Sequence, residues 1–175
     1  MSVEGEIGHR VVTPPLPRSI WVIAWASLAG QLVLLVGNGI REVNEVSLLV
    51  SAALGGVIVG FVSAGVVRAR TGRLVLACVV LVLTLVAEAV ILVTVDTLRE
   101  GTLAGLSLAS TAVALAGLAR FRTTDWYAWI RAYPSARSRI SIGRVLVIGV
   151  LVGILGGVVE LPDAEPLILV TLGDG

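Results

Sequence analysis

The sequence has few residues with reactive side chains. Among its 175 residues there is one cysteine, Cys78, one histidine, His9, and no lysine. A single cysteine excludes a disulfide within the chain, and a lone histidine near the N-terminus cannot supply a metal cluster or the base of a catalytic triad. The sequence also contains no phosphate-binding loop, dinucleotide fingerprint or zinc motif. We therefore predict no enzymatic activity, no cofactor and no metal site.

Charge is scarce as well, and hydrophobic residues dominate the chain. Only 14% of the residues are charged, 57% are hydrophobic and the mean hydropathy is +1.00, well outside the range of soluble domains. A helix needs about 20 apolar residues to cross a hydrocarbon core of about 30 Å. The uncharged runs predict an all-α integral membrane protein, a polytopic bundle of five transmembrane helices, with four crossings if the last run does not span. The predicted spans are residues 19–40, 46–67, 74–95, 101–119 and 144–160.

The distribution of arginine predicts the orientation. All arginines except Arg41 and Arg99 lie before span one, between spans two and three, or between spans four and five. By the positive-inside rule, residues 1–18 form a cytoplasmic tail, residues 19–160 the transmembrane domain and residues 161–175 an extracytoplasmic tail. Arginine in place of lysine, with many Ala, Val, Leu and Gly residues, is typical of a GC-rich bacterial genome. We therefore expect a multi-pass protein of the bacterial cytoplasmic membrane.

A cluster of aromatic residues follows the fourth predicted span. Trp126, Trp129 and Tyr133 fall on one face of a helix expected over residues 125–133, which Asp125 can cap. Because such rings favour the headgroup level, we predict a short interfacial helix whose neighbouring arginines lie near anionic lipid on the cytoplasmic side. A loop whose tryptophans pack under the bundle is the alternative, and nucleic-acid binding is not predicted. The arginines in question are Arg131, Arg137 and Arg139.

Small residues recur at every fourth position in two of the spans. Such residues let helix backbones approach closely, which is a main source of helix association in a bilayer. We predict that both stripes are helix-packing faces, either against each other or toward a second copy of the chain or a partner membrane protein. The second span carries Ala52, Gly56, Gly60 and Ala64, and the fifth carries Gly149, Gly153 and Gly157.

Glu88 is the one carboxylate inside an otherwise uncharged span. An ionised carboxylate near the membrane centre costs roughly 2.5–3.5 kcal/mol, so such residues normally face protein or water, and burial favours the neutral acid. Counting residues from the outer ends of the spans places several polar side chains at a similar depth. We therefore predict an intramembrane polar layer, whose members are Glu88, Gln31, Thr84, Ser107 and Thr111.

Two functions are consistent with this sequence. In the first, Glu88 is a neutral acid hydrogen-bonded to Gln31 or to a hydroxyl, and the protein is a structural or accessory component of a membrane assembly. In the second, Glu88 is the proton or cation site of a small transporter or channel. A third interpretation is that Glu88 is simply open to water at the outer surface, and in that case the residue implies no function. The sequence favours the first, since no second intramembrane charge accompanies Glu88 as a relay or counter-ion.

Overall fold

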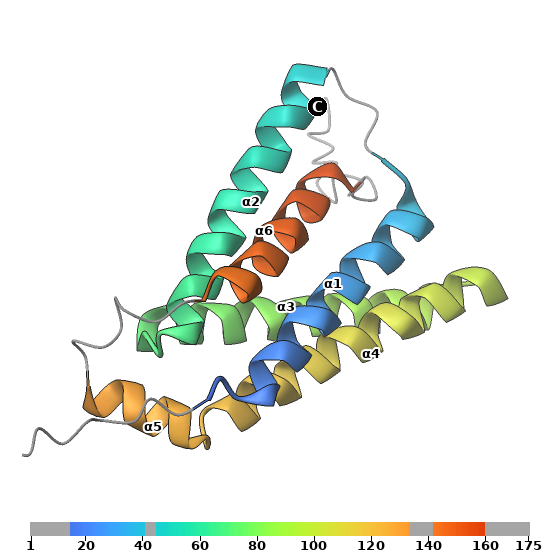
Figure 1. Cartoon of the computed structure of the whole chain (residues 1–175). Coiled ribbons are helices and arrows are strands. Elements are labelled where there is room, and N and C mark those ends of the chain that lie inside the picture. The colour runs from blue at the N-terminus through green and yellow to red at the C-terminus, as the bar shows by residue number, and fades with distance from the viewer. Residues whose placement is uncertain (1–14, 41–44, 134–141, 160–175) are drawn as a thin grey trace, which may run out of the picture.

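A computed structural model describes residues 15–40, 45–133 and 142–159 (Figure 1). These residues form six helices and no strand, which confirms the predicted all-helical class for this part of the chain. Most of the two predicted tails, and the predicted lipid-facing residues Arg137 and Arg139, lie outside the described residues. The helices are α1 (Arg18–Asn38), α2 (Glu45–Val67), α3 (Thr71–Thr94), α4 (Leu98–Phe121), α5 (Asp125–Ala132) and α6 (Gly143–Val158).

Four helices, α1 to α4, are long and apolar enough to cross a membrane, with 21 to 24 residues each. At about 1.5 Å per residue they measure roughly 31–36 Å, which matches a hydrocarbon core of about 30 Å. Helix α6 is also apolar but has only 16 residues. Large apolar side chains on α2 and α3, such as Val57, Phe61 and Leu83, are exposed on the bundle surface. These features indicate a multi-pass membrane protein.

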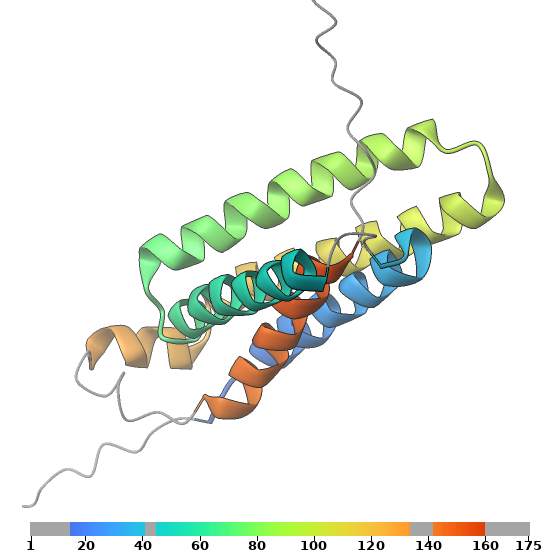
Figure 2. The same cartoon turned by 90° about the horizontal axis from the view of Figure 1, so that it is seen from above.

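The five apolar helices form two close pairs and one outer helix (Figure 1). α2 packs against α6, α1 packs against α4, and α1 also contacts α6. α3 contacts α4 and α2, and it stands on the outside of the bundle when the molecule is seen from above (Figure 2). α5 lies at the end where α1 begins and where α2 and α4 end, whereas the opposite ends of α2 and of the α3–α4 hairpin diverge (Figure 1).

The two predicted stripes of small residues pack against each other. A methyl group added at Gly153 would overlap the backbone of Gly55 and Gly56, and one added at Gly157 would overlap the backbone of Ser51. The backbones of α2 and α6 are therefore in direct contact, which only small residues permit. The contact continues along both helices: Gly56 and Gly60 face Val150, Gly149 faces Ser63, Gly157 faces Ala52, and Ala64 packs against the core near α5.

A second close contact, between α1 and α4, was not predicted from the sequence. A methyl group at Gly30 of α1 would lie 2.6 Å from Ser110 Oγ, and one at Gly117 of α4 would lie 2.8 Å from the side chain of Ile23. Each helix contributes only one of these glycines, so the sequence contains no repeated stripe of small residues that would predict the contact. A single small residue on each helix is sufficient for this close approach.

The most deeply buried apolar residues lie at the α5 end of the bundle. Trp126 and Ile130 of α5 are 3% and 0% exposed, and they pack with Ile20, Val67 and Phe121 at the ends of α1, α2 and α4. Trp126 Nε1 donates a hydrogen bond to the Val67 carbonyl oxygen at 3.2 Å. This carbonyl lies in the last turn of α2, where no intrahelical donor remains for it. These buried apolar residues thus form the core at the α5 end of the bundle.

Helix α5 exists as predicted, but its apolar face differs from the predicted lipid-facing arrangement. Trp126 is 3% exposed and lies under the bundle, where it finds both apolar neighbours and an acceptor for its N–H group. Trp129 is half-buried beside it, while Arg131 and Tyr133 are exposed. The alternative in which the tryptophans pack under the bundle therefore describes Trp126 better.

Threonine hydroxyls cap two of the helices. Thr97 Oγ1 accepts a hydrogen bond from the Glu100 N–H at 3.3 Å, and it lets α4 begin three residues before the predicted span. Thr124 Oγ1 accepts from the Tyr127 N–H at 3.3 Å at the start of α5. The predicted cap, Asp125, is instead the first residue of that helix.

Candidate ligand-binding cavity at Glu88

Glu88 is buried between α3 and α4. Its side chain is 8% exposed, and its Oε1 accepts hydrogen bonds from Ser107 Oγ at 2.5 Å and from Thr111 Oγ1 at 3.1 Å. Ser107 and Thr111 lie four residues apart on α4, so both hydroxyls point to the same side of that helix. These three residues, the Glu88 cluster, join α3 to α4 through polar contacts within apolar surroundings.

The second carboxyl oxygen of Glu88, Oε2, is buried and has no hydrogen-bond partner among the described residues. Neither protonation state removes this deficit. A carboxylate leaves Oε2 without a donor, and a neutral acid leaves it either as a hydroxyl without an acceptor or as an unpaired carbonyl oxygen. An unsatisfied buried polar atom costs about 1–3 kcal/mol. A bound group that pairs with Oε2 would therefore be stabilised there.

Glu88 lies on the wall of a cavity of about 460 Å³, to which α1, α2, α3, α4 and α6 all contribute residues. We call this space the Glu88 cavity. Its wall is mainly aliphatic, and Glu88 is the only charged residue among the described residues that line it. Sites for small molecules are typically about 300–1,000 Å³ in volume and mostly apolar, with a few placed polar groups. The uncharged polar residues on the wall are Ser27, Gln31, Ser63, Thr84, Ser107, Ser110 and Thr111.

Two members of the predicted polar layer, Thr84 and Gln31, line the Glu88 cavity but are not the hydrogen-bond partners of Glu88. Thr84 Oγ1 donates a hydrogen bond to the Val80 carbonyl oxygen at 3.0 Å, one turn earlier in α3. The carboxamide oxygen of Gln31 faces α6, where it would lie 3.3 Å from a methyl group added at Gly156. The partners of Glu88 in the described chain are thus the two α4 hydroxyls and not Gln31.

The sequence did not reveal the cavity itself. Ser27 and Ser63 lie on its wall, but serine is common in membrane helices, where its hydroxyl often bonds to the backbone of the preceding turn. Ser110 makes such a bond, from its Oγ to the Ser107 carbonyl oxygen at 2.7 Å. No spacing of these residues signals a cavity, because its volume depends on how far apart the helices stand.

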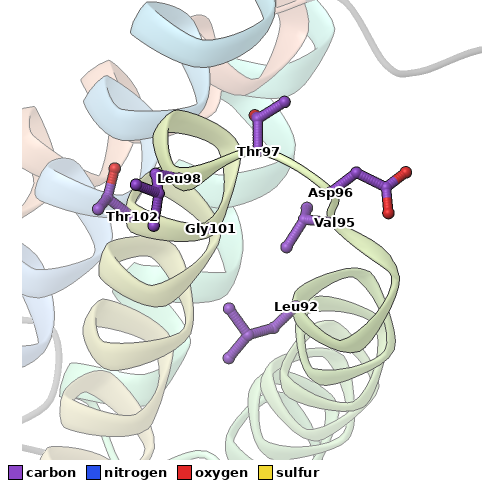
Figure 3. Close-up of a pocket in the computed structure, with 7 residues that line it drawn as sticks. All are labelled: Leu92, Val95, Asp96, Thr97, Leu98, Gly101 and Thr102. Carbon is purple, nitrogen blue, oxygen red and sulfur yellow. The ribbon is translucent and has the colours of Figure 1, made fainter.

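A second, shallower hollow of about 350 Å³ lies at the α3–α4 turn (Figure 3). Leu92 and Val95 point into the space between the two helices, whereas the carboxylate of Asp96 points away from it (Figure 3). The Thr97 hydroxyl is engaged in capping α4. The residues that line this hollow therefore bring no polar groups together, and we do not interpret it as a site.

Metal-binding residues are not clustered in the described part of the chain, where no three His, Cys, Asp or Glu residues lie together. Comparison of the chain with protein-family models, with curated proteins and with solved structures found no match. Function is therefore inferred from the geometry of the Glu88 cavity.

Proposed function

We propose that this chain is a small multi-pass transporter that binds a proton or a cation at Glu88. The observation that carries the proposal is the buried carboxyl group of Glu88, a residue that lines a cavity of about 460 Å³ and whose Oε2 atom has no hydrogen-bond partner among the described residues. Ionisable groups are rare in membrane helices because they are costly to desolvate, and those that occur mark paths for ions, protons and substrates.

A purely structural role accounts less well for this geometry. Hydrogen bonds between membrane helices contribute only about 0.6–2 kcal/mol. A serine or threonine at position 88 would offer a hydroxyl for such a bond without adding a second buried oxygen, whose cost is about 1–3 kcal/mol. A residue that only packs helices together is also expected in a filled interior, since protein interiors are close-packed. Glu88 instead borders a cavity.

The experiment is a flux assay with the full chain in liposomes that carry an inside-acid pH gradient and an enclosed pH dye. We expect the wild-type protein to dissipate the gradient when a transported cation, inorganic or organic, is added outside. Glu88→Gln should abolish this flux with little change in the thermal stability of the protein in detergent. Glu100→Gln, the same chemical change at an exposed site on α4, should behave like the wild type. Equal flux through wild type and Glu88→Gln would contradict the proposal.

We further propose that the N-terminus is cytoplasmic and the membrane is that of a bacterium. Positive residues should lie on the cytoplasmic side. In the described chain the arginines other than Arg99 lie at the helix ends around α5, whereas Glu45, Asp96 and Glu100 lie at the opposite ends. The arginines at the α5 end are Arg18, Arg68, Arg70, Arg73, Arg120, Arg122, Arg131 and Arg144.

We also propose that α6 is a fifth crossing. An isolated bridge between Ile40 and Val159 places the end of α6 beside the end of α1, on the side opposite α5. The 16 residues of α6 span only about 24 Å at about 1.5 Å each, which is short for a core of about 30 Å. Local thinning of the bilayer accommodates such a helix at modest cost.

Single-cysteine labelling tests this orientation. In a Cys78→Ala background, a cysteine at Glu100 should react with a membrane-impermeant maleimide in intact cells. A cysteine at Ala132, at the end of α5, should react only after the membrane is permeabilised. Both native side chains are exposed on the described chain, so accessibility within the protein does not limit either reaction. The reverse labelling pattern would invert the proposed topology.

The accessory-component prediction remains the rival. The glycine stripes that suggested a partner or a second copy are occupied by the α2–α6 contact within one chain, so they lend it no support. Crosslinking in native membranes separates the two functions. A stoichiometric partner protein, together with no flux through the isolated chain for any cation, would favour the accessory role and contradict transport.

A further inference from the structure

We infer that the ligand of the Glu88 cavity is a singly charged organic cation with an apolar body, and that its charge pairs with the carboxyl group of Glu88. This inference rests on the proposed function, since it takes the cavity as the place where the transported species binds. It follows from three properties of the cavity wall: its apolar lining, its single charge, and the hydrogen bonds that its polar groups already make.

The apolar lining favours a ligand with an apolar body. Aliphatic side chains from all five apolar helices form most of the wall, for example Leu34, Val59, Leu81, Leu118 and Val152. A cavity of about 460 Å³ falls within the range of sites that hold small organic molecules, about 300–1,000 Å³. A hydrated ion would leave most of this surface without complementary contacts.

The charge of the wall selects a single positive charge. Glu88 is the only titratable or charged group that α1, α2, α3, α4 and α6 present to the cavity within the described chain. An anion would find no basic partner on this wall. A dication would keep one uncompensated charge in an apolar medium, which is costly. One carboxylate therefore matches one positive charge.

The same wall offers too few oxygen ligands for an inorganic ion. Calcium and magnesium require about six or more oxygen ligands, usually with several carboxylates or waters. Here a single carboxyl group is available, and the hydroxyls nearest to it on α4 already donate to its Oε1 atom. The Thr84 and Ser110 hydroxyls donate to backbone carbonyls. An organic cation needs only one anionic contact, and Glu88 is the one acidic residue among the described residues on this wall.

Benzyltrimethylammonium and three matched probes test this inference on the purified full chain in detergent. Tetramethylammonium lacks the apolar ring, neopentylbenzene has the same shape without the charge, and sodium is a bare inorganic cation. Binding is measured by calorimetry. We expect benzyltrimethylammonium to bind, and tetramethylammonium to bind at least about tenfold more weakly because the ring is missing.

Variants test the role of the carboxyl group. Glu88→Gln should remove this binding, whereas Glu100→Gln should retain it. If Glu88→Gln does not fold, the comparison of the four probes on the wild-type protein still decides the matter, and Glu88→Asp keeps the carboxyl group for a second comparison.

Two outcomes would overturn the inference: equal binding of neopentylbenzene, or binding of sodium as tight as that of benzyltrimethylammonium. The proposed function can fail separately. Glu88-dependent binding of the organic cation but no flux in liposomes would keep the ligand class and contradict transport. Glu88-dependent sodium flux without binding of the organic cation would keep transport and overturn the ligand class.

Discussion

Replacing Gly153 with alanine tests the closest helix contact in the fold. The added methyl group would overlap the carbonyl oxygen of Gly55, and it would lie 2.6 Å from the carbonyl carbon of Gly55 and 2.8 Å from the Cα of Gly56. Ordinary contact for such a group begins at 3.4 Å. All three obstructing atoms belong to the α2 backbone, so they cannot rotate away. α2 and α6 must therefore move apart.

The cost of this movement follows from the loss of packing along the α2–α6 contact. A gap of 0.5–1 Å forfeits about a quarter to a half of the van der Waals attraction between facing atoms. Substitutions that overpack an interior cost about 1–3 kcal/mol, and the cost is largest where no flexible side chain can adjust. For Gly153→Ala we expect the free energy of unfolding to fall by about 2–3 kcal/mol, near the upper end of that range.

Unfolding in mixed micelles with increasing sodium dodecyl sulfate, followed by tryptophan fluorescence, measures this change. Gly105→Ala is the matched control, because a methyl group at Gly105 in α4 meets nothing within 4 Å. The control should be as stable as the wild type, or slightly more stable, since alanine favours a helix over glycine by about 0.5–1 kcal/mol. If the two variants were equally stable, the backbones of α2 and α6 could not be in contact.

Two further substitutions address the contacts around α5 and Glu88. Trp126→Phe removes the donor to the Val67 carbonyl oxygen. We expect the free energy of unfolding to fall by about 0.5–1.5 kcal/mol. Hydrogen exchange should detect a larger exposed surface near the C-terminal end of α2. Ser107→Ala removes one of the two donors to Glu88 Oε1, and a loss of about 0.6–2 kcal/mol is expected. Combining Ser107→Ala with Glu88→Ala, which removes the acceptor, in a double-mutant cycle should reveal a coupling energy, and strictly additive effects would show that the two side chains do not interact.

The sequence predicts the long helices well because one property, the length of an uncharged run, is sufficient to identify them. The sequence predicts the helix ends less well, since polar contacts extend the helices beyond the uncharged runs. Arg73 is charged, yet it lies inside α3, where its guanidinium donates to the Phe61 carbonyl oxygen at 2.9 Å and lies 3.4 Å above the centre of the Phe61 ring. Such a contact depends on the path of the α2–α3 turn, which no hydropathy pattern records.

The candidate site is partly predictable for a similar reason. A constant rise per residue fixes depth in the membrane, so counting along the spans brings Ser107 and Thr111 to the level of Glu88. Depth does not fix direction around the helix axis relative to a neighbour. Gln31 and Thr84 lie on the cavity wall but are not the hydrogen-bond partners of Glu88. The direction of the Gln31 side chain depends on how α1 packs against α4 and α6.

The placement of glycine also explains why the interior has a cavity beside its single carboxyl group. Gly55 and Gly153 bring α2 and α6 into backbone contact, and Gly30 and Gly117 let α1 and α4 pack closely against the side chains of Ser110 and Ile23. The space between the two pairs is left to side chains, and large aromatic residues fill it only near α5. Lipid tails are as apolar as leucine, so the hydrophobic effect does not close the remaining space, and atoms on its wall lose van der Waals contacts. A bound group with an apolar body would restore these contacts while pairing with Glu88.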